Sequence, residues 1–266
     1  MMKTKHLKWK TKCKLCLLPS LIGTAVFFAV PYLRVLYYSV IDNQFKRNFV
    51  GIDNYIKTLQ NEYFLLALKN SLLLIAIAVP VLIALALVIS LALSYGIKWV
   101  RKTRFAFVLP MVIPTAGIVI IWRSVFAEST TVLPIYLLFI WKNIGICIVL
   151  LTAAFTSIEH SIYEAARLDG AGAFALHTKI TIPMIMPTVV FSVLLSIVNS
   201  FKIFKESYLF YGTNYPPDHS YTLQYYMNNN FLKLDYQSLA TSAVLTSILV
   251  FGIVAAGMAI QRRCDR

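Results

Sequence analysis

The sequence predicts an all-α polytopic membrane protein with six transmembrane helices. Hydrophobic residues make up 59% of the 266 residues and charged residues only 14%, whereas about 25% of the residues of a soluble domain are charged. A helix needs roughly 20 apolar residues to cross the hydrocarbon core of a bilayer. Six apolar runs meet this requirement, at about residues 15–40, 71–95, 105–127, 132–156, 184–204 and 238–260. Short connectors join most of them, so we expect one transmembrane domain over residues 1–266.

The distribution of basic residues predicts the orientation of these helices. The formal net charge is +14, and the tail of residues 1–14 alone holds six lysines. With six spans, fifteen Lys and Arg residues fall on the side of the two termini and seven on the other side. Because basic residues remain cytoplasmic, both termini are predicted to be cytoplasmic, with residues 1–14 as a basic tail. The positive charge therefore reflects topology, and we expect no nucleic-acid binding.

The connector after the first span predicts a surface helix. Over residues 54–68, four apolar side chains recur at helical spacing: Ile56, Leu59, Tyr63 and Leu66. This pattern indicates an amphipathic helix that lies on the membrane surface. Asp53 is suited to cap its N-terminus.

The charged residues near the spans argue against a carrier that works alone. All eleven acidic residues lie in connectors or at span edges, whereas a proton- or sodium-coupled carrier usually needs a carboxylate within the membrane. The basic residues Lys142 and Lys202 either extend to an interface or line a polar path. The energy for any transport is therefore expected to come from another chain.

Sequence motifs for nucleotide, metal or catalytic chemistry are absent. There is no G-x-x-x-x-G-K-[ST] phosphate-binding loop, so the chain is not expected to bind ATP. Cys13 and Cys16 form a lone C-x-x-C without the second pair that a zinc site needs. The four histidines are scattered. We expect no metal and no cofactor on this chain.

The connector between the fourth and fifth spans predicts a helix–turn–helix elbow. Ser161 and Glu164 have the spacing of a capping box, although the helix could equally begin two residues earlier, since Ser157 ends the preceding span. One face of this helix combines two isoleucines with two alanines: Ile158, Ile162, Ala165 and Ala166. The small alanines would let another surface approach closely.

The second half of the elbow is defined by a glycine and a proline. Gly170 permits a left-handed turn where the first helix must stop. A second short helix is predicted to continue to about residue 180. Pro183 then suits the first turn of the fifth span.

The last outer connector, residues 205–237, is rich in tyrosine and asparagine. Aromatic faces and amide groups are suited to a sugar site. Tyrosines also anchor proteins at membrane interfaces and pack between helices, so both interpretations stay open.

The elbow resembles the signature loop of permease subunits in binding-protein-dependent ABC importers. The shared pattern is Glu164-Ala165-Ala166, three residues, Gly170, nine residues and then Ile180-x-Ile182-Pro183, where Ile182 replaces the usual leucine. Other stretches resemble the maltose and multiple-sugar permeases of the carbohydrate branch: residues 49–55, 109–123, 141–143 and 201–209. Residues 210–216 depart from the usual Leu-Thr-x-Gly-Gly-Pro pattern.

The resemblance implies a type I ABC importer permease fold with residues 159–183 as a cytoplasmic coupling loop. It implies a multi-pass subunit of the bacterial cytoplasmic membrane that works with a second, homologous permease, two ATPase subunits and an extracytoplasmic solute-binding protein. ATP and magnesium would bind to the ATPase subunits, and this chain would not be an enzyme. The residues expected to couple to the ATPase are Glu164, Ala165, Ala166, Asp169, Gly170 and Pro183.

The resemblance also implies a carbohydrate as the substrate. Polar and aromatic candidates for the substrate path are Asn143, Asn199, Ser200 and Phe204. Such residues also join helices within a bundle without touching a substrate. The alternatives are import of another small polar solute such as a sugar phosphate, a secondary carrier, or an integral membrane enzyme that uses His160 and Glu164.

Overall fold

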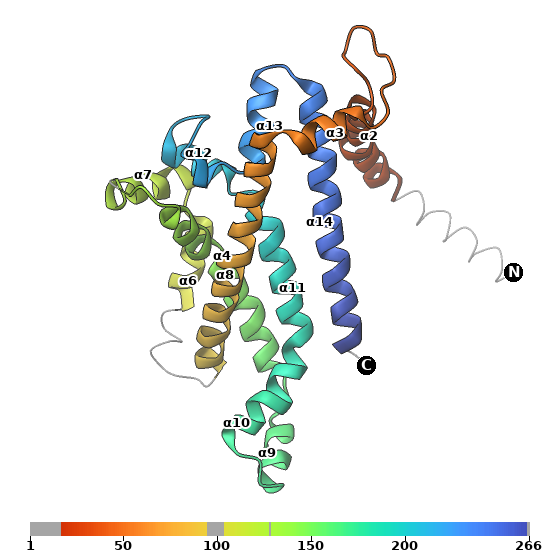
Figure 1. Ribbon diagram of the computed structural model, residues 1–266. Helices are drawn as coiled ribbons and strands as arrows, with labels where there is room; N and C mark the ends of the chain where they lie inside the picture. The colour runs from red at the N-terminus through yellow and green to blue at the C-terminus, as the bar shows by residue number, and fades with distance from the viewer. Residues whose placement is uncertain (1–16, 95–103, 128, 265–266) are drawn as a thin grey trace, which may run out of the picture. The chain divides into compact units, whose positions relative to one another are not determined.

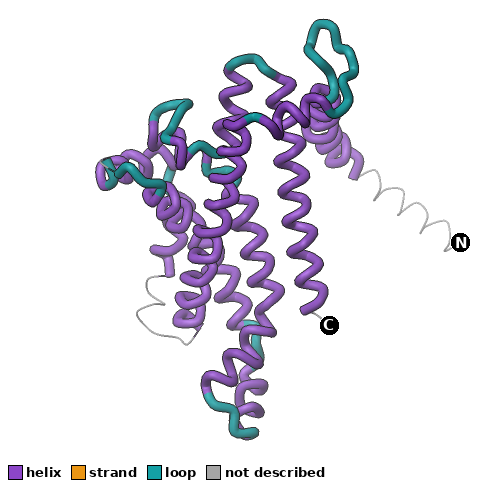
Figure 2. Tube along the Cα trace, viewed as in Figure 1, coloured by secondary structure: helices purple, strands orange, loops and turns teal. Residues whose placement is uncertain are grey.

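The computed structural model describes residues 17–94, 104–127 and 129–264, and within them nearly all secondary structure is helical (Figure 2). The described residues outside the helices include one isolated antiparallel bridge, between Ile41 and Phe49. Among the described residues, five helices are long and apolar enough to cross a membrane: Leu17–Ser39, Glu62–Ser94, Leu133–Thr156, Phe174–Ser200 and Tyr236–Ala259. A bent pair, Ala106–Val112 and Thr115–Val125, accounts for the sixth predicted run. The predicted basic tail and the Cys13–Cys16 pair lie outside the described residues.

The described chain divides into two compact units. The first contains residues up to Asn61 together with Asn230–Thr246, and the second contains Glu62–Asn229 together with the residues from Ser247 onward. The helices that begin in the first unit are η1 (Ala25–Ala29), α2 (Val30–Ser39), α3 (Asp53–Gln60) and α14 (Tyr236–Cys264). Those that begin in the second are α4 (Glu62–Ser94), α6 (Arg104–Val112), α7 (Thr115–Val125), α8 (Leu133–Thr156), α9 (His160–Leu168), α10 (Ala173–Leu176), η2 (His177–Thr181), α11 (Ile182–Ser200), α12 (Phe204–Tyr211), η3 (Asp218–Ser220) and α13 (Leu223–Leu232).

The predicted amphipathic helix over residues 54–68 is two helices in the structure. Asn61 adopts an extended conformation with ψ of 121°, so α3 ends at Gln60 and the following residues begin α4. Asp53 is not the N-cap of α3 as predicted, because Ile52 takes that position and Asp53 is the first residue of the helix. Instead, the amide of Asn54 donates to the carbonyls of Ser39 (3.0 Å) and Ile41 (2.8 Å), which fastens α3 to the end of α2.

The core of the second unit is formed by α4, α8 and α11, which run side by side (Figure 1). Their contact surfaces bury Leu82, Leu138, Ile148 and Leu151 almost completely. Helix α6 packs closely against α8 at Gly145, where a Cβ atom would collide with the carbonyl oxygen of Phe107. Glycine at this position is therefore required by the close approach of two helix backbones.

The third predicted run is sharply bent. Helices α6 and α7 meet at 111°, and the break falls at Pro114, which has an extended ψ of 131°. Proline disfavours the helical conformation of the residue before it, so the break follows from the sequence around residue 114. The indole N–H of Trp122 donates to the carbonyl of Pro134 (2.8 Å), and its ring stacks on Trp141 with centroids 5.7 Å apart. These contacts hold α7 against the first turns of α8.

The tyrosine- and asparagine-rich connector is folded and largely packed. Tyr225 is fully buried and its hydroxyl lies 3.2 Å from that of Ser207. The backbone N–H of Leu223 donates to Ser71 of α4 (3.0 Å). Burial raises the pKa of the Tyr225 hydroxyl above its usual value, and it also raises the pKa of Tyr221 and of Tyr211. The sequence left open whether these tyrosines bind a sugar or pack between helices, and Tyr225 packs between helices.

Candidate functional site

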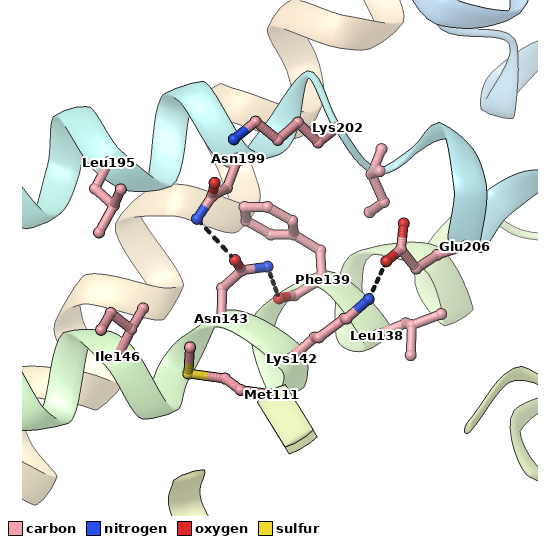
Figure 3. Close-up of a pocket in the computed structure, with 11 residues that line it drawn as sticks. Met111, Leu138, Phe139, Lys142, Asn143, Ile146, Leu195, Asn199, Lys202 and Glu206 are labelled. Carbon is pink, nitrogen blue, oxygen red and sulfur yellow. Dashed lines mark hydrogen bonds and ion pairs between the residues drawn. The ribbon is translucent and has the colours of Figure 1, made fainter. Parts of the chain in front are cut away.

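A cavity of about 510 Å³ lies between α8 and α11, and Glu206 of α12 also lines it (Figure 3). Helix α8 lines it with one face, because its contributing residues recur at spacings of three and four. The lining residues are Met111 from α6, Leu138, Phe139, Lys142, Asn143 and Ile146 from α8, Leu195 and Asn199 from α11, and Lys202, Ile203 and Glu206 from the segment that follows. The walls are therefore mainly apolar, with a small group of amide and charged side chains.

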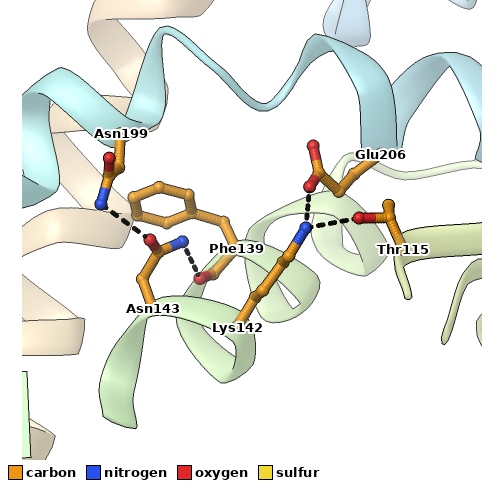
Figure 4. Close-up of polar contacts among 6 residues, drawn as sticks. All are labelled: Thr115, Phe139, Lys142, Asn143, Asn199 and Glu206. Carbon is orange, nitrogen blue, oxygen red and sulfur yellow. Dashed lines mark hydrogen bonds and ion pairs between the residues drawn. The ribbon is translucent and has the colours of Figure 1, made fainter. Parts of the chain in front are cut away.

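The charged side chains in this cavity are paired. The ammonium group of Lys142 forms an ion pair with Oε1 of Glu206 and also donates to the hydroxyl of Thr115 at 2.8 Å (Figure 4). The Lys142 and Glu206 side chains are only 23% and 11% exposed. An unpaired charge at such a depth would be costly, so the pair explains how a lysine is accommodated within an apolar run. Of the two predicted interpretations, the structure thus favours a place in the protein interior for Lys142, at the wall of the cavity that Lys202 also lines.

The two asparagines in the cavity form a bridge between its walls. The Asn143 amide donates to the carbonyl of Phe139 (2.8 Å), one turn earlier in α8. The Asn199 amide of α11 donates to Oδ1 of Asn143 (3.1 Å). One continuous chain of hydrogen bonds therefore joins the α8 backbone to α11.

Two of the four predicted substrate-path residues, Asn143 and Asn199, line this cavity together. The other two do not line it. The Ser200 hydroxyl is buried and donates to the carbonyl of Ile197 (2.7 Å). Phe204 packs edge-on against Tyr225 with ring centroids 4.9 Å apart.

Sequence reasoning missed Glu206, because it was counted only as a connector residue. A signal was nevertheless available. Lys142 lies inside an apolar run, and a lysine in that position needs a nearby counter-charge. Glu206 is the first acidic residue after the span that carries Asn199.

The elbow between α8 and α11 extends beyond the ends of these two helices (Figure 1). Glu164, Ala165, Asp169 and Gly170 are exposed, and Ala166 is half-buried. Two large apolar side chains also project from the elbow, with Leu168 90% and Phe174 82% exposed.

The turn of the elbow forms as predicted at Gly170. Its φ is +82°, and the backbone N–H groups of Gly170 and Ala171 donate to the carbonyls of Arg167 (3.0 Å) and Ala166 (2.9 Å). This is the hydrogen-bond pattern of a Schellman motif. The predicted capping box is absent: α9 begins at His160, and Ser161 donates to the carboxylate of Glu159 at 3.3 Å. The earlier of the two predicted helix starts is therefore the one that occurs.

The two halves of the elbow are braced against each other. The hydroxyls of Tyr163 in α9 and Thr181 in η2 lie 3.1 Å apart, and Thr181 is buried. A second cavity, of about 390 Å³, lies beneath this contact and is lined in part by Arg167 and His177. The second helix of the elbow runs into α11 without interruption, through the π-helical turn η2, so Pro183 stands inside a helix that is continuous from Phe174 to Ser200.

The amino-acid sequence is similar to those of transport proteins. A family model described as "Binding-protein-dependent transport system inner membrane component" matches residues 71–266. The sn-glycerol-3-phosphate transport system permease protein UgpA of Yersinia pestis is 26% identical over 90% of this chain and 90% of its own length. The arabinooligosaccharides transport system permease protein AraP of Bacillus subtilis is 28% identical over 89% of this chain and 85% of its own length.

The fold is also similar to a solved structure. The crystal structure of a bacterial ABC transporter involved in the import of the acidic polysaccharide alginate contains a chain that is similar over its full length and the full length of this chain. The TM-score is 0.76 at 22% sequence identity.

Proposed function

The chain belongs to the binding-protein-dependent transport system inner membrane components, and we propose that it is the permease subunit of an ABC importer for a carbohydrate. The family match covers both the cavity and the elbow. The proposal rests mainly on the connection between the cavity and the elbow. Helices α8 and α11 form the cavity walls, and the elbow is the segment that joins these two helices.

The cavity supports a small polar substrate. Its volume of about 510 Å³ lies within the range of small-molecule sites. The amides of Asn143 and Asn199 offer hydrogen-bonding groups, and Phe139 adds an aromatic surface beside them. The name of AraP, an arabinooligosaccharide permease, favours an oligosaccharide.

The elbow supports coupling to a separate ATPase. Leu168 and Phe174 give it an apolar surface of the kind that anchors an interface, and Glu164 and Asp169 place carboxylates beside it. The contact between Tyr163 and Thr181 links the two halves of the elbow, so that they would move together. A displacement of the elbow by the ATPase would therefore move the ends of α8 and α11, and with them the two sides of the cavity.

This mechanism requires three kinds of protein partner and a membrane. We propose a second, homologous permease, two ATPase subunits that bind ATP and magnesium, an extracytoplasmic solute-binding protein, and the bacterial cytoplasmic membrane as the site of assembly. The excess of basic residues on one side supports cytoplasmic placement of the elbow and of both termini.

One observation favours a second candidate substrate. Lys202 adds another positive charge to the cavity, and UgpA is a permease for sn-glycerol 3-phosphate. Import of a sugar phosphate is therefore the alternative within the same mechanism.

Reconstitution tests this function. The complete complex in proteoliposomes is expected to take up an arabinooligosaccharide only when its binding protein and ATP are supplied. The permease subunit alone is expected to take up nothing under a proton or sodium gradient. Uptake by the isolated subunit under such a gradient would refute the proposal.

A further inference from the structure

Glu206 has one carboxylate oxygen that faces no protein donor. The residue is 8% exposed and lines the cavity between α8 and α11. Its Oε1 atom is held by Lys142, whereas Oε2 is buried and has no hydrogen-bond partner among the residues that the structure describes. Figure 4 shows Oε2 pointing away from the lysine.

A buried carboxylate oxygen without a donor is unfavourable in a resting protein. The described residues supply no donor to Oε2, and two of the three N–H bonds of the Lys142 ammonium group are directed to Oε1 and to the hydroxyl of Thr115. Because Glu206 lines the cavity, a molecule bound there can supply the donor that Oε2 lacks. A hydroxyl group that donates to a carboxylate makes a short, charge-assisted hydrogen bond.

The negative charge at Oε2 favours a neutral donor at this atom. A phosphate or a carboxylate of a substrate would meet the negative charge of Glu206, and like charges at short range in a partly buried site repel each other. Lys142 cannot attract such an anion freely, since it is engaged by Glu206. The remaining polar groups on the walls are the neutral amides of Asn143 and Asn199 and the ammonium group of Lys202, which has no part in the ion pair.

We propose that Glu206 binds a substrate hydroxyl through Oε2 and thereby selects a neutral, polyhydroxylated solute. Lys142 is the positioning residue, because it fixes Oε1 and leaves Oε2 directed away from the ion pair. This inference rests on the proposed function, carbohydrate import, and it extends that function by naming the group that recognises the cargo.

The test measures solute uptake per ATP hydrolysed by the complete complex in proteoliposomes. The neutral probe is an arabinooligosaccharide and the anionic probe is sn-glycerol 3-phosphate, each with its binding protein. Glu206→Gln keeps the shape of the side chain and removes its charge. The double variant Lys142→Met, Glu206→Leu removes both charges together, so that neither is left unpaired. Lys205→Met is the matched control, since Lys205 is exposed, lies next to Glu206 in the sequence and does not line the cavity.

Glu206→Gln and the double variant are expected to lower uptake of the neutral probe per ATP by about tenfold, the effect of losing one charge-assisted hydrogen bond. ATP hydrolysis stimulated by the loaded binding protein should persist, and Lys205→Met should retain wild-type uptake. A double variant with wild-type uptake per ATP would show that the ion pair only supports the fold, and would overturn the inference.

Two further outcomes separate the inference from the function on which it rests. A wild-type complex that imports only sn-glycerol 3-phosphate overturns the role of Glu206 but leaves an importer. A wild-type complex that imports neither probe contradicts carbohydrate import itself, and the inference falls with it.

Discussion

The side-chain amide of Asn199 in α11 donates a 3.1 Å hydrogen bond to Oδ1 of Asn143 in α8, directly across the cavity. This contact joins the two helices that the elbow also connects. A polar contact between membrane helices contributes about 0.6 kcal/mol on average and up to about 1.7 kcal/mol. We expect Asn143→Ala, Asn199→Ala and the double variant to show a coupling energy in this range when unfolding is measured in detergent. Strictly additive effects of the two substitutions would show that the bridge does not contribute to stability.

Replacing Gly145 with alanine is expected to separate α6 from α8. The added Cβ collides with the carbonyl oxygen of Phe107 and lies 3.2 Å from the Cα atom of Val108, both of them backbone atoms that cannot rotate away. Overpacking of this kind costs about 1–3 kcal/mol. Gly117→Ala in α7 is the control, because no atom lies within 4 Å of its added Cβ. Equal thermal stability of the two variants in detergent would contradict the close approach.

Gly170→Val is expected to impair coupling without preventing insertion. The φ of +82° is unfavourable for a β-branched residue, while no neighbouring atom lies within 4 Å of an added Cβ, so the strain is confined to the backbone of the turn. We expect a cost of about 1–3 kcal/mol in the turn and reduced ATP-dependent uptake. Gly172→Val, two residues away and equally open, is the matched control. Full uptake by Gly170→Val would argue against a role for this turn in coupling.

The exposed apolar residues of the elbow should matter for ATPase binding and not for folding. Leu168→Asp and Phe174→Asp are expected to reduce the ATPase that co-purifies with the permease by about fivefold or more, since anchor residues contribute more than about 1 kcal/mol each. Their thermal stability should be unchanged because both side chains are exposed. Phe45→Asp provides a comparison, since Phe45 is 96% exposed but lies in the loop between α2 and α3. Equal loss of ATPase in all three variants would indicate a non-specific effect of charge.

Alkaline pH should destabilise the connector that holds Tyr225. Burial raises the pKa of this hydroxyl in the folded protein above the value of about 10 expected in an unfolded chain. The stabilisation is complete below pH 10 and is lost as the pH rises above it, because the unfolded state then releases its proton first. The unfolding midpoint of Tyr225→Phe is therefore expected to fall less steeply above pH 10 than that of the wild type. The exposed Tyr215 supplies a control as Tyr215→Phe.

Features that depend on a local pattern of residues could be predicted from the sequence alone. The apolar runs, the left-handed turn at Gly170 and the polarity of Asn143 and Asn199 all depend on residues close together in the chain. Glu206 could not be placed in this way, because it meets Lys142 across 64 positions of the sequence and only after α11 and α12 have folded back over α8. The capping box failed for a different reason: Glu159, at the N-cap, has an extended backbone with ψ of 136°, so the helix starts before Ser161.

The bend at Pro114 determines where polar groups can be tolerated inside the bilayer. With nine and eleven residues, α6 and α7 are roughly 14 and 17 Å long, and neither alone crosses a hydrocarbon layer about 30 Å thick. The backbone groups freed at the break cannot face lipid, since nothing there would hydrogen-bond to them. Thr115, the first residue after the break, instead accepts a hydrogen bond from Lys142. The interrupted helix and the ion pair therefore meet at Thr115 and form one polar cluster.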